Sequence, residues 1–183
     1  MTTYSLRFPV AVIMRRVPLA NRWVSERWEP AAIEPETSAP AAAPVALGDD
    51  GGGPRWRFGG FALELHPSEA EGYFLNISAP EPKVFVMWRM PEDDDAGEPV
   101  ARPVVVTVSY SQAARMQDGG EQVDALPLPP ALHDWMRPYV AEHYKPEPRR
   151  KVRRNDPFRD EAERQGAAPR GPDRGPDRDQ GRR

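Results

Sequence analysis

The sequence predicts a mainly β domain of the α+β class, in which about six antiparallel strands form a curled sheet or small barrel and a C-terminal amphipathic helix covers its open side. Three observations predict this fold. Apolar and polar residues alternate along several short segments, which is the period of strands. Turn-like sequences join most of these segments and leave no room for the helices that parallel strands require. A helical apolar period occurs near the end of the domain.

Six segments carry the two-residue period, and we expect a strand in each. Phe61 and Leu63, for example, lie on one face of such a strand, with Glu64 on the other. The six segments are residues 8–17, 21–30, 61–66, 71–78, 83–90 and 103–110. Residues 35–54 connect the second segment to the third and are rich in Pro, Ala and Gly. We therefore expect a flexible loop insertion at a hairpin end.

Two helical segments are expected after the last strand. Residues 109–118 fit a short helix that ends before a Gly-Gly pair. Residues 128–144 repeat apolar side chains at helical spacing, with Trp135 expected to plug the core. Because proline lacks an amide hydrogen, Pro138 inside this segment predicts a kink or two short helices.

The composition changes abruptly at Lys145. Residues 145–183 contain 13 Lys/Arg, 8 Asp/Glu and one aromatic residue, whereas residues 1–144 contain 12 basic and 20 acidic residues. So few apolar side chains cannot offset the entropy that the chain loses on ordering. We therefore expect residues 1–144 to form a single acidic, β-rich domain and residues 145–183 to form a disordered basic tail.

The composition also excludes several classes of protein. The chain has no cysteine, which excludes disulfides, thiolate nucleophiles and iron–sulfur ligation. No apolar run approaches the roughly 20 residues that cross a bilayer. The N-terminal segment lacks the basic start and the small-residue cleavage site of a signal peptide. We expect a soluble cytoplasmic protein without a bound cofactor.

No metal site is expected. The three histidines are scattered, and none lies in a His-Glu-x-x-His motif. His133 and His143 would lie about 15 Å apart on one helix, which is too far to share an ion. The acidic run at residues 92–98 lacks the spacing of a calcium loop, so we expect a solvated hairpin tip there.

An enzyme would need a reactive cluster that the sequence does not display. No serine lies in the Gly-x-Ser-x-Gly elbow of hydrolases. The nearest approach to an acid–base site is Glu64 or Glu71 with His66, and these side chains would have to converge in a buried cleft. We therefore expect a protein without enzymatic activity.

Four of the five tryptophans have an arginine beside them, and these two residue types dominate the energetics of protein interfaces. We expect core positions for Trp23 and Trp88 more than for Trp28 and Trp56. Of the pair Trp23 and Trp28, one should fill the interior and the other should cover the outer face, under the helix or under a partner. The candidate binding residues in this group are Arg22, Trp23, Arg27, Trp28 and Trp56.

Two charged segments complete the candidate binding residues. Residues 118–124 combine a helix stop with acidic groups, which makes them a candidate surface. The tail packs five basic residues into residues 148–154, but interleaved acidic residues follow them and dilute any affinity for nucleic acid. The candidates are Asp118, Glu121 and Asp124 at the turn, and Arg149, Arg150, Lys151, Arg153, Arg154 and Phe158 in the tail.

Several segments occur together in the order typical of one bacterial family. They include "RWVSERWEPAAI", "GFALELHPSEAEGYFLNISAPEPKVFVMWRM" and "LHDWMRPYVAEHYKPEPRRK". From about Val10 to Lys151 the sequence resembles the family of domains of unknown function numbered thirty-three-oh-five. The longer insertion at residues 35–54 and the tail after Arg154 depart from its pattern. The family has no assigned activity, but the resemblance implies a genomic context, since such genes commonly accompany those for a molybdenum-dependent formate dehydrogenase and its maturation factors.

These observations predict a non-enzymatic accessory or adaptor protein. The resemblance adds an expected role in the assembly or regulation of a formate dehydrogenase, with a subunit or maturation factor of that enzyme as the partner. The alternative is a regulatory β-barrel that binds a small ligand in a pocket lined by Trp and Tyr.

Overall fold

The computed structural model describes residues 5–20, 22–91 and 99–145, and the structural statements below concern these residues. The chain divides into two units, Met1–Pro146 and Glu147–Arg183. The expected acidic hairpin tip at residues 92–98 and the expected tail from Pro146 onward lie outside the described residues.

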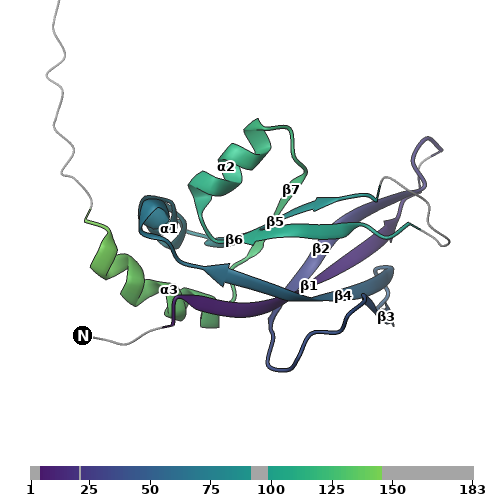
Figure 1. The fold of residues 1–183 in the computed structure, drawn as a ribbon. Helices are drawn as coiled ribbons and strands as arrows, with labels where there is room; N and C mark the ends of the chain where they lie inside the picture. The colour runs from purple at the N-terminus through teal and green to yellow at the C-terminus, as the bar shows by residue number, and fades with distance from the viewer. Residues whose placement is uncertain (1–4, 21, 92–98, 146–183) are drawn as a thin grey trace, which may run out of the picture. The chain divides into compact units, whose positions relative to one another are not determined.

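The first sheet consists of four antiparallel strands, which are β1 (Arg7–Pro18), β2 (Glu26–Pro35), β3 (Val45–Asp49) and β4 (Pro54–Glu64) (Figure 1). Their order across the sheet is β2-β1-β4-β3. β1 lies inside the sheet because it pairs with β2 on one side and with β4 on the other. Five consecutive residues, from Val10 to Met14, are buried, so both faces of β1 are covered there.

The second sheet consists of three antiparallel strands, which are β5 (Lys83–Arg89), β6 (Arg102–Thr107) and β7 (Val123–Pro127), in the order β6-β5-β7. The central strand β5 is apolar on both faces. Val84 and Val86 join a core that also contains β1 side chains, whereas Phe85 and Met87 belong to a smaller cluster on the other face. This two-sided burial explains why the sequence of β5 does not alternate cleanly.

Three helices cover the sheets. They are α1 (Ala70–Ile77), which follows the 3₁₀ turn η1 (Pro67–Glu69), α2 (Tyr110–Asp118) and α3 (Pro130–His143). α2 packs on the outer face of the second sheet through Ala113. It begins at Ser109, whose hydroxyl accepts from the amide of Gln112 at 3.0 Å, and it ends at Gly119. Gly120 has φ +83°, so the expected helix stop at the Gly-Gly pair is confirmed.

The C-terminal helix α3 packs on the core that the two sheets share. Leu132, Met136 and Tyr139 are almost fully buried in that core. Trp135 is half-buried at its margin, with its ring 5.3 Å from that of Phe8, so it covers the core rather than plugging it. α3 continues through Pro138 without a break.

Three expectations about the sheets need correction. The expected curled sheet or small barrel is instead two separate sheets that share one core. β3 lies inside residues 35–54, which we expected to be a flexible loop, and β7 follows the Gly-Gly stop where no strand was expected. β3 is recognisable only by its pairing with β4, because all five of its residues are exposed.

The expected strand at residues 71–78 is instead the helix α1, which runs from Ala70 to Ile77 and is capped by Ser78. Tyr73 and Ile77 alternate with other residues, but they are also four positions apart, which places them on one face of a helix. Tyr73 and Asn76 are buried and Leu75 is exposed, a pattern that only the helix satisfies.

Asn76 ties α1 to the second sheet. The residue is 1% exposed, and its Nδ2 donates to the carbonyl oxygens of Lys83 at 2.7 Å and Val108 at 2.8 Å. Its Oδ1 accepts from the Lys83 amide at 2.8 Å. Three main-chain groups at the start of β5 and just after β6 therefore depend on one side-chain amide.

We expect Asn76→Ala to lower the free energy of unfolding by about 3 kcal/mol, because it leaves three main-chain groups without partners. Urea denaturation followed by circular dichroism would measure this loss. Leu75→Ala in the same helix is the matched control, since Leu75 is 47% exposed, and it should change stability by less than about 0.5 kcal/mol. An equal effect of the two substitutions would contradict the role of Asn76.

Candidate functional site

Four tryptophans gather at one end of the sheets, which we call the hairpin end and define by Trp23, Trp28, Trp56 and Trp88. The β1–β2 connection, the start of β4 and the end of β5 lie at this end, whereas α1 and α3 lie at the other (Figure 1). These are the four tryptophans that have an arginine beside them in the sequence. The fold therefore brings the Trp-Arg pairs into one region, although they are spread over three strands and a loop.

Trp28 fills the interior of the hairpin end. It is 6% exposed, and its ring lies 5.1 Å from that of Trp56. Arg16 lies opposite Trp28 in the register of β1 and β2, and its guanidinium lies 5.7 Å from the Trp56 ring centroid. Trp28 Nε1 has no hydrogen-bond partner in the part of the chain that the structure describes. Trp28 and Trp56 thus form the floor of the hairpin end, and a contact of either with a partner stays a prediction.

Trp23 is the exposed member of the pair. It is 79% exposed, the guanidinium of Arg22 lies 4.3 Å from its ring centroid, and the next residue, Val24, is 51% exposed. The expectation that Trp23 enters the core before Trp28 is wrong. β2 begins at Glu26, so Trp23 lies in the connection after β1, where the alternation of a strand does not apply.

Two of the predicted acidic residues hold β7 to β5. Glu121 forms an ion pair with Arg89, whose Nε donates to Oε2 at 2.9 Å. This hydrogen bond lowers the pKa of Glu121 below its ordinary value. Asp124 accepts from Trp88 Nε1 at 2.7 Å. Both carboxylates therefore form contacts within the domain, and a partner that bound them would have to compete with Arg89 and Trp88.

The remaining predicted binding residues do not form one cluster with the tryptophans of the hairpin end. Arg27 forms an ion pair with Glu29 within β2. Asp118 is exposed at the end of α2. The tail candidates lie outside the described residues, namely Arg149, Arg150, Lys151, Arg153, Arg154 and Phe158.

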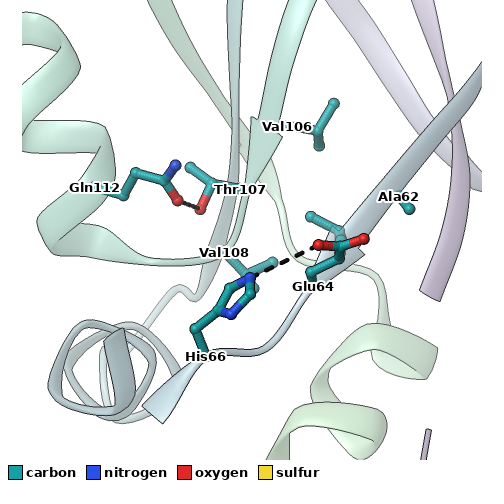
Figure 2. A pocket seen from close by; sticks show the side chains of 8 residues that line it. Ala62, Glu64, His66, Val106, Thr107, Val108 and Gln112 are labelled. Carbon is teal, nitrogen blue, oxygen red and sulfur yellow. Dashed lines mark hydrogen bonds and ion pairs between the residues drawn. The ribbon is translucent and has the colours of Figure 1, made fainter. Parts of the chain in front are cut away.

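A polar pocket of about 180 Å³ opens between β4 and β6 (Figure 2). Glu64 and His66 line it from the end of β4, and Thr107 and Gln112 line it from the end of β6 and from α2. Thr107 Oγ1 donates to Gln112 Oε1 at 2.6 Å. The pocket can offer a carboxylate, an imidazole and an amide to a small polar ligand.

The acid–base arrangement considered from the sequence is only partly assembled in this pocket. His66 Nε2 lies 3.7 Å from Glu64 Oε2, but both side chains are more than half exposed (Figure 2). Glu71 is exposed on α1 and does not line the pocket. A solvated pair of this kind interacts weakly, since water screens its charges.

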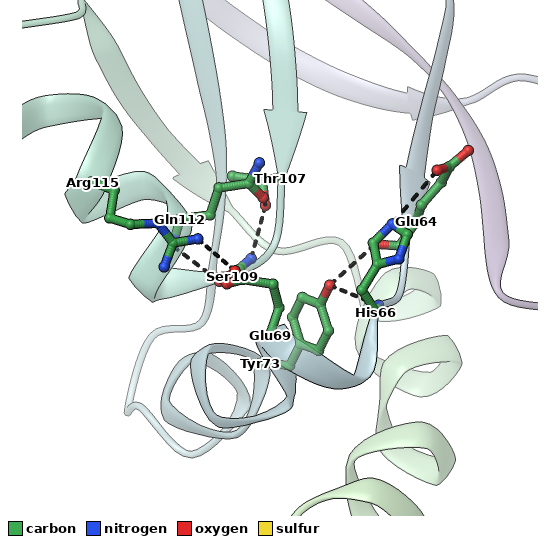
Figure 3. Close-up of polar contacts among 8 residues, drawn as sticks. All are labelled: Glu64, His66, Glu69, Tyr73, Thr107, Ser109, Gln112 and Arg115. Carbon is green, nitrogen blue, oxygen red and sulfur yellow. Dashed lines mark hydrogen bonds and ion pairs between the residues drawn. The ribbon is translucent and has the colours of Figure 1, made fainter. Parts of the chain in front are cut away.

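Glu69 is the carboxylate that sequence reasoning missed (Figure 3). It accepts from the buried hydroxyl of Ser109 at 2.5 Å and forms an ion pair with Arg115. Burial raises the pKa of Glu69, but the hydrogen bonds from Ser109 and Arg115 and the charge of Arg115 outweigh it, so the pKa lies below its ordinary value. No local pattern could have revealed this contact, because 40 residues separate Glu69 from Ser109.

Tyr73 fixes the main chain beside the same pocket (Figure 3). Its hydroxyl accepts from the amide of His66 and donates to the carbonyl oxygen of Glu64, at 3.2 Å in each case. Burial raises the pKa of Tyr73. The phenol therefore stays protonated near neutral pH and holds the turn between β4 and α1.

We expect Glu69→Gln to lower the free energy of unfolding by about 1 kcal/mol at pH 7. Because the pKa of Glu69 is lowered in the folded state, its contribution is complete above the ordinary glutamate pKa and is lost as the pH falls through the folded-state value. The difference between wild type and variant should therefore shrink from about pH 5 downward in urea titrations. Glu71→Gln, at an exposed position nearby, is the control, and a difference that grows on acidification would contradict the assignment.

His133 and His143 both have neighbours on α3. In the described parts of the chain, no group of three or more His, Asp or Glu residues could hold a metal ion. The His143 ring stacks on that of Tyr139 with 4.0 Å between centroids, and His133 Nδ1 lies 3.6 Å from an oxygen of Asp134. Both histidines thus pack or pair on α3.

Comparisons with known proteins identify the family. Residues 9–153 match the family described as "Protein of unknown function (DUF3305)", which includes all strands from β2 to β7, most of β1 and all three helices. No curated protein and no solved structure was found to match the chain. None of the helices in the described residues has the length and apolar character needed to span a membrane. The chain belongs to the DUF3305 family of proteins of unknown function.

Proposed function

We propose that this protein is a non-enzymatic accessory protein that binds another protein through its hairpin end. The observation that carries the proposal is the exposure of Trp23, which is 79% exposed beside the half-exposed Val24. An indole in water is unfavourable by roughly 25 cal/mol per Å² of apolar surface, so a partner that covers it gains that free energy. Trp and Arg are also the residues that contribute most to measured interfaces.

The loop that carries Trp23 is held at its base. The amide of Leu19 donates to the carbonyl oxygen of Ser25 at 2.8 Å, and Pro18 pairs with Glu26 at the start of the hairpin. The stacked guanidinium of Arg22 restricts the indole further. An indole restricted in this way loses less conformational entropy on binding than a free side chain does.

The hairpin end also offers a recess for a partner side chain. A pocket of about 230 Å³ is lined by residues from both sides of the β1–β2 hairpin and from the start of β4, namely Arg16, Pro18, Ser25, Glu26 and Pro54. The surface around it combines an exposed indole with the cation of Arg22. We infer a partner face on which an apolar residue stands beside an acidic one.

The family resemblance supplies the partner to be tested first. Because such genes commonly accompany those of a molybdenum-dependent formate dehydrogenase, we propose that the partner is a subunit or a maturation factor of that enzyme. The accessory protein would then assist its assembly or regulation. An accessory role of this kind requires no catalytic step at the hairpin end or in the polar pocket.

The polar pocket between β4 and β6 favours a second candidate function, the regulatory binding of a small polar ligand. Its lining differs from the expected one, because neither Trp nor Tyr contributes to it. The two candidates are separable by substitution. Changes at Trp23 should affect protein binding only, and changes at Gln112 should affect ligand binding only.

We expect Trp23→Ala to weaken binding of the formate dehydrogenase component by at least about tenfold, because it removes the exposed indole from the interface. The measurement is co-purification from a host that expresses the dehydrogenase genes, followed by titration calorimetry with the recovered component. The melting temperature of the variant should match that of the wild type, since an exposed side chain contributes little to stability.

Tyr110→Ala is the matched control, because Tyr110 is an exposed aromatic residue on α2, outside the hairpin end. It should leave binding unchanged. The proposal fails if no component of the dehydrogenase or of its maturation machinery is recovered with the wild type. It also fails if the two substitutions have the same effect.

A further inference from the structure

An apolar groove of about 300 Å³ lies between α1 and α3, away from the hairpin end. Phe74 and Ile77 form its wall on α1, and Val140, Ala141 and Tyr144 form its floor on and just after α3. The rings of Phe74 and Tyr144 meet at one end, 4.7 Å apart. Phe74, Ile77 and Tyr144 are only partly buried, so the groove leaves apolar surface in contact with water.

The groove exists because α3 carries two stripes with different side chains. Leu132, Met136 and Tyr139 point into the core. The next stripe, His133, Arg137 and Ala141, lies at the i, i+4, i+8 spacing beside it and faces α1. Ala141 is the smallest residue of this stripe and leaves the space that a larger side chain would fill.

The charge at the groove has one sign. Arg137 lines it, and the guanidinium forms no ion pair within the described residues. His133 also lines it, with the carboxylate of Asp134 3.6 Å away, but neither Asp nor Glu is among the lining residues. An unpaired guanidinium at an apolar groove favours a ligand that brings its own carboxylate.

We propose that this groove binds a carboxylate with a single unbranched apolar chain of medium length. The carboxylate pairs with Arg137, and the chain lies along α3 over Ala141 toward Tyr144. The axial distance from Arg137 to Tyr144 is about 10 Å, which an extended chain of such a ligand covers. This site is separate from the protein-binding role of the hairpin end and does not depend on it.

Octanoate is the probe, titrated below its micelle concentration into the full-length protein and followed by ¹⁵N-resolved NMR. We expect saturable shifts at Phe74, Ile77, Arg137 and Ala141. Octylamine has the same chain with the opposite charge and should bind at least about tenfold more weakly.

Arg137→Gln should weaken octanoate binding by about tenfold, because it removes one charge-assisted hydrogen bond to the carboxylate. Ala141→Leu should abolish it, because the added side chain fills the groove. Their matched controls are Arg102→Gln on the exposed side of β6 and Ala131→Leu at the exposed start of α3, which should bind as the wild type does. Trp23→Ala should also leave octanoate binding unchanged, so failure here is distinguishable from failure of the proposed function.

Several results would overturn the proposal. They are the absence of saturable octanoate binding, equal binding of octylamine, and wild-type binding by Arg137→Gln. Tighter binding of N-acetylphenylalanine at the same residues would identify a peptide terminus as the occupant instead. Concentration-dependent shifts of these residues without any ligand would identify a second copy of the chain.

Discussion

The burial of β1 on both faces is the constraint on which the rest of the structure depends. Val10, Val12 and Met14 enter the core shared with the second sheet, while Ala11 and Ile13 face the opposite side and are also buried. Ile13 lies beside Arg57 in the register of β1 and β4, and Arg57 pairs with Glu34 and Glu36. Such ion pairs contribute little free energy themselves.

On this outer face, the side chains of these ion pairs cover apolar surface of the sheet. The aliphatic stem of an arginine can shield apolar surface while its guanidinium reaches carboxylates and water. This arrangement can complete the outer face of the four-stranded sheet, on which none of the three described helices packs. The helices are then left for the second sheet and for the far end of the core, where α2 and α3 pack.

This distribution separates three regions that have different chemistry. The hairpin end is aromatic and cationic, and its indole floor supports one exposed tryptophan. The corner where α1 meets α2 is polar and is closed by Glu69, Ser109 and Arg115. Gly72 is required there, because a Cβ at that position would lie 2.4 Å from Ser109 Oγ. The groove between α1 and α3 is apolar with one cation. The proposed protein contact at the hairpin end and the proposed ligand site in the groove share no residue, so each can be tested without disturbing the other.

Sequence periodicity located most strands but failed where a short segment fitted two periods. Tyr73 and Ile77 satisfy both a strand and a helix, and only the hydrogen bonds of Asn76 to β5 and to Val108 show which arrangement has partners for the main chain. β3 was missed because it has no buried face, so its stability comes entirely from pairing with β4. Trp23 and Trp28 were exchanged because β2 begins at Glu26, five positions later than the expected strand at residues 21–30, which leaves Trp23 outside the strand.

Local chemistry was sufficient for the β-rich class, the family resemblance, the Gly-Gly end of α2 and the amphipathic α3, since each depends on residues within a few positions of one another. The clustering of the Trp-Arg pairs, the contact of Glu69 with Ser109 and the groove beside Ala141 depend on residues that are distant in the chain. Those contacts form only when strands and helices pack. Burial and pairing between elements decide which side of each element faces water, and the intrinsic secondary-structure preference of the residues does not.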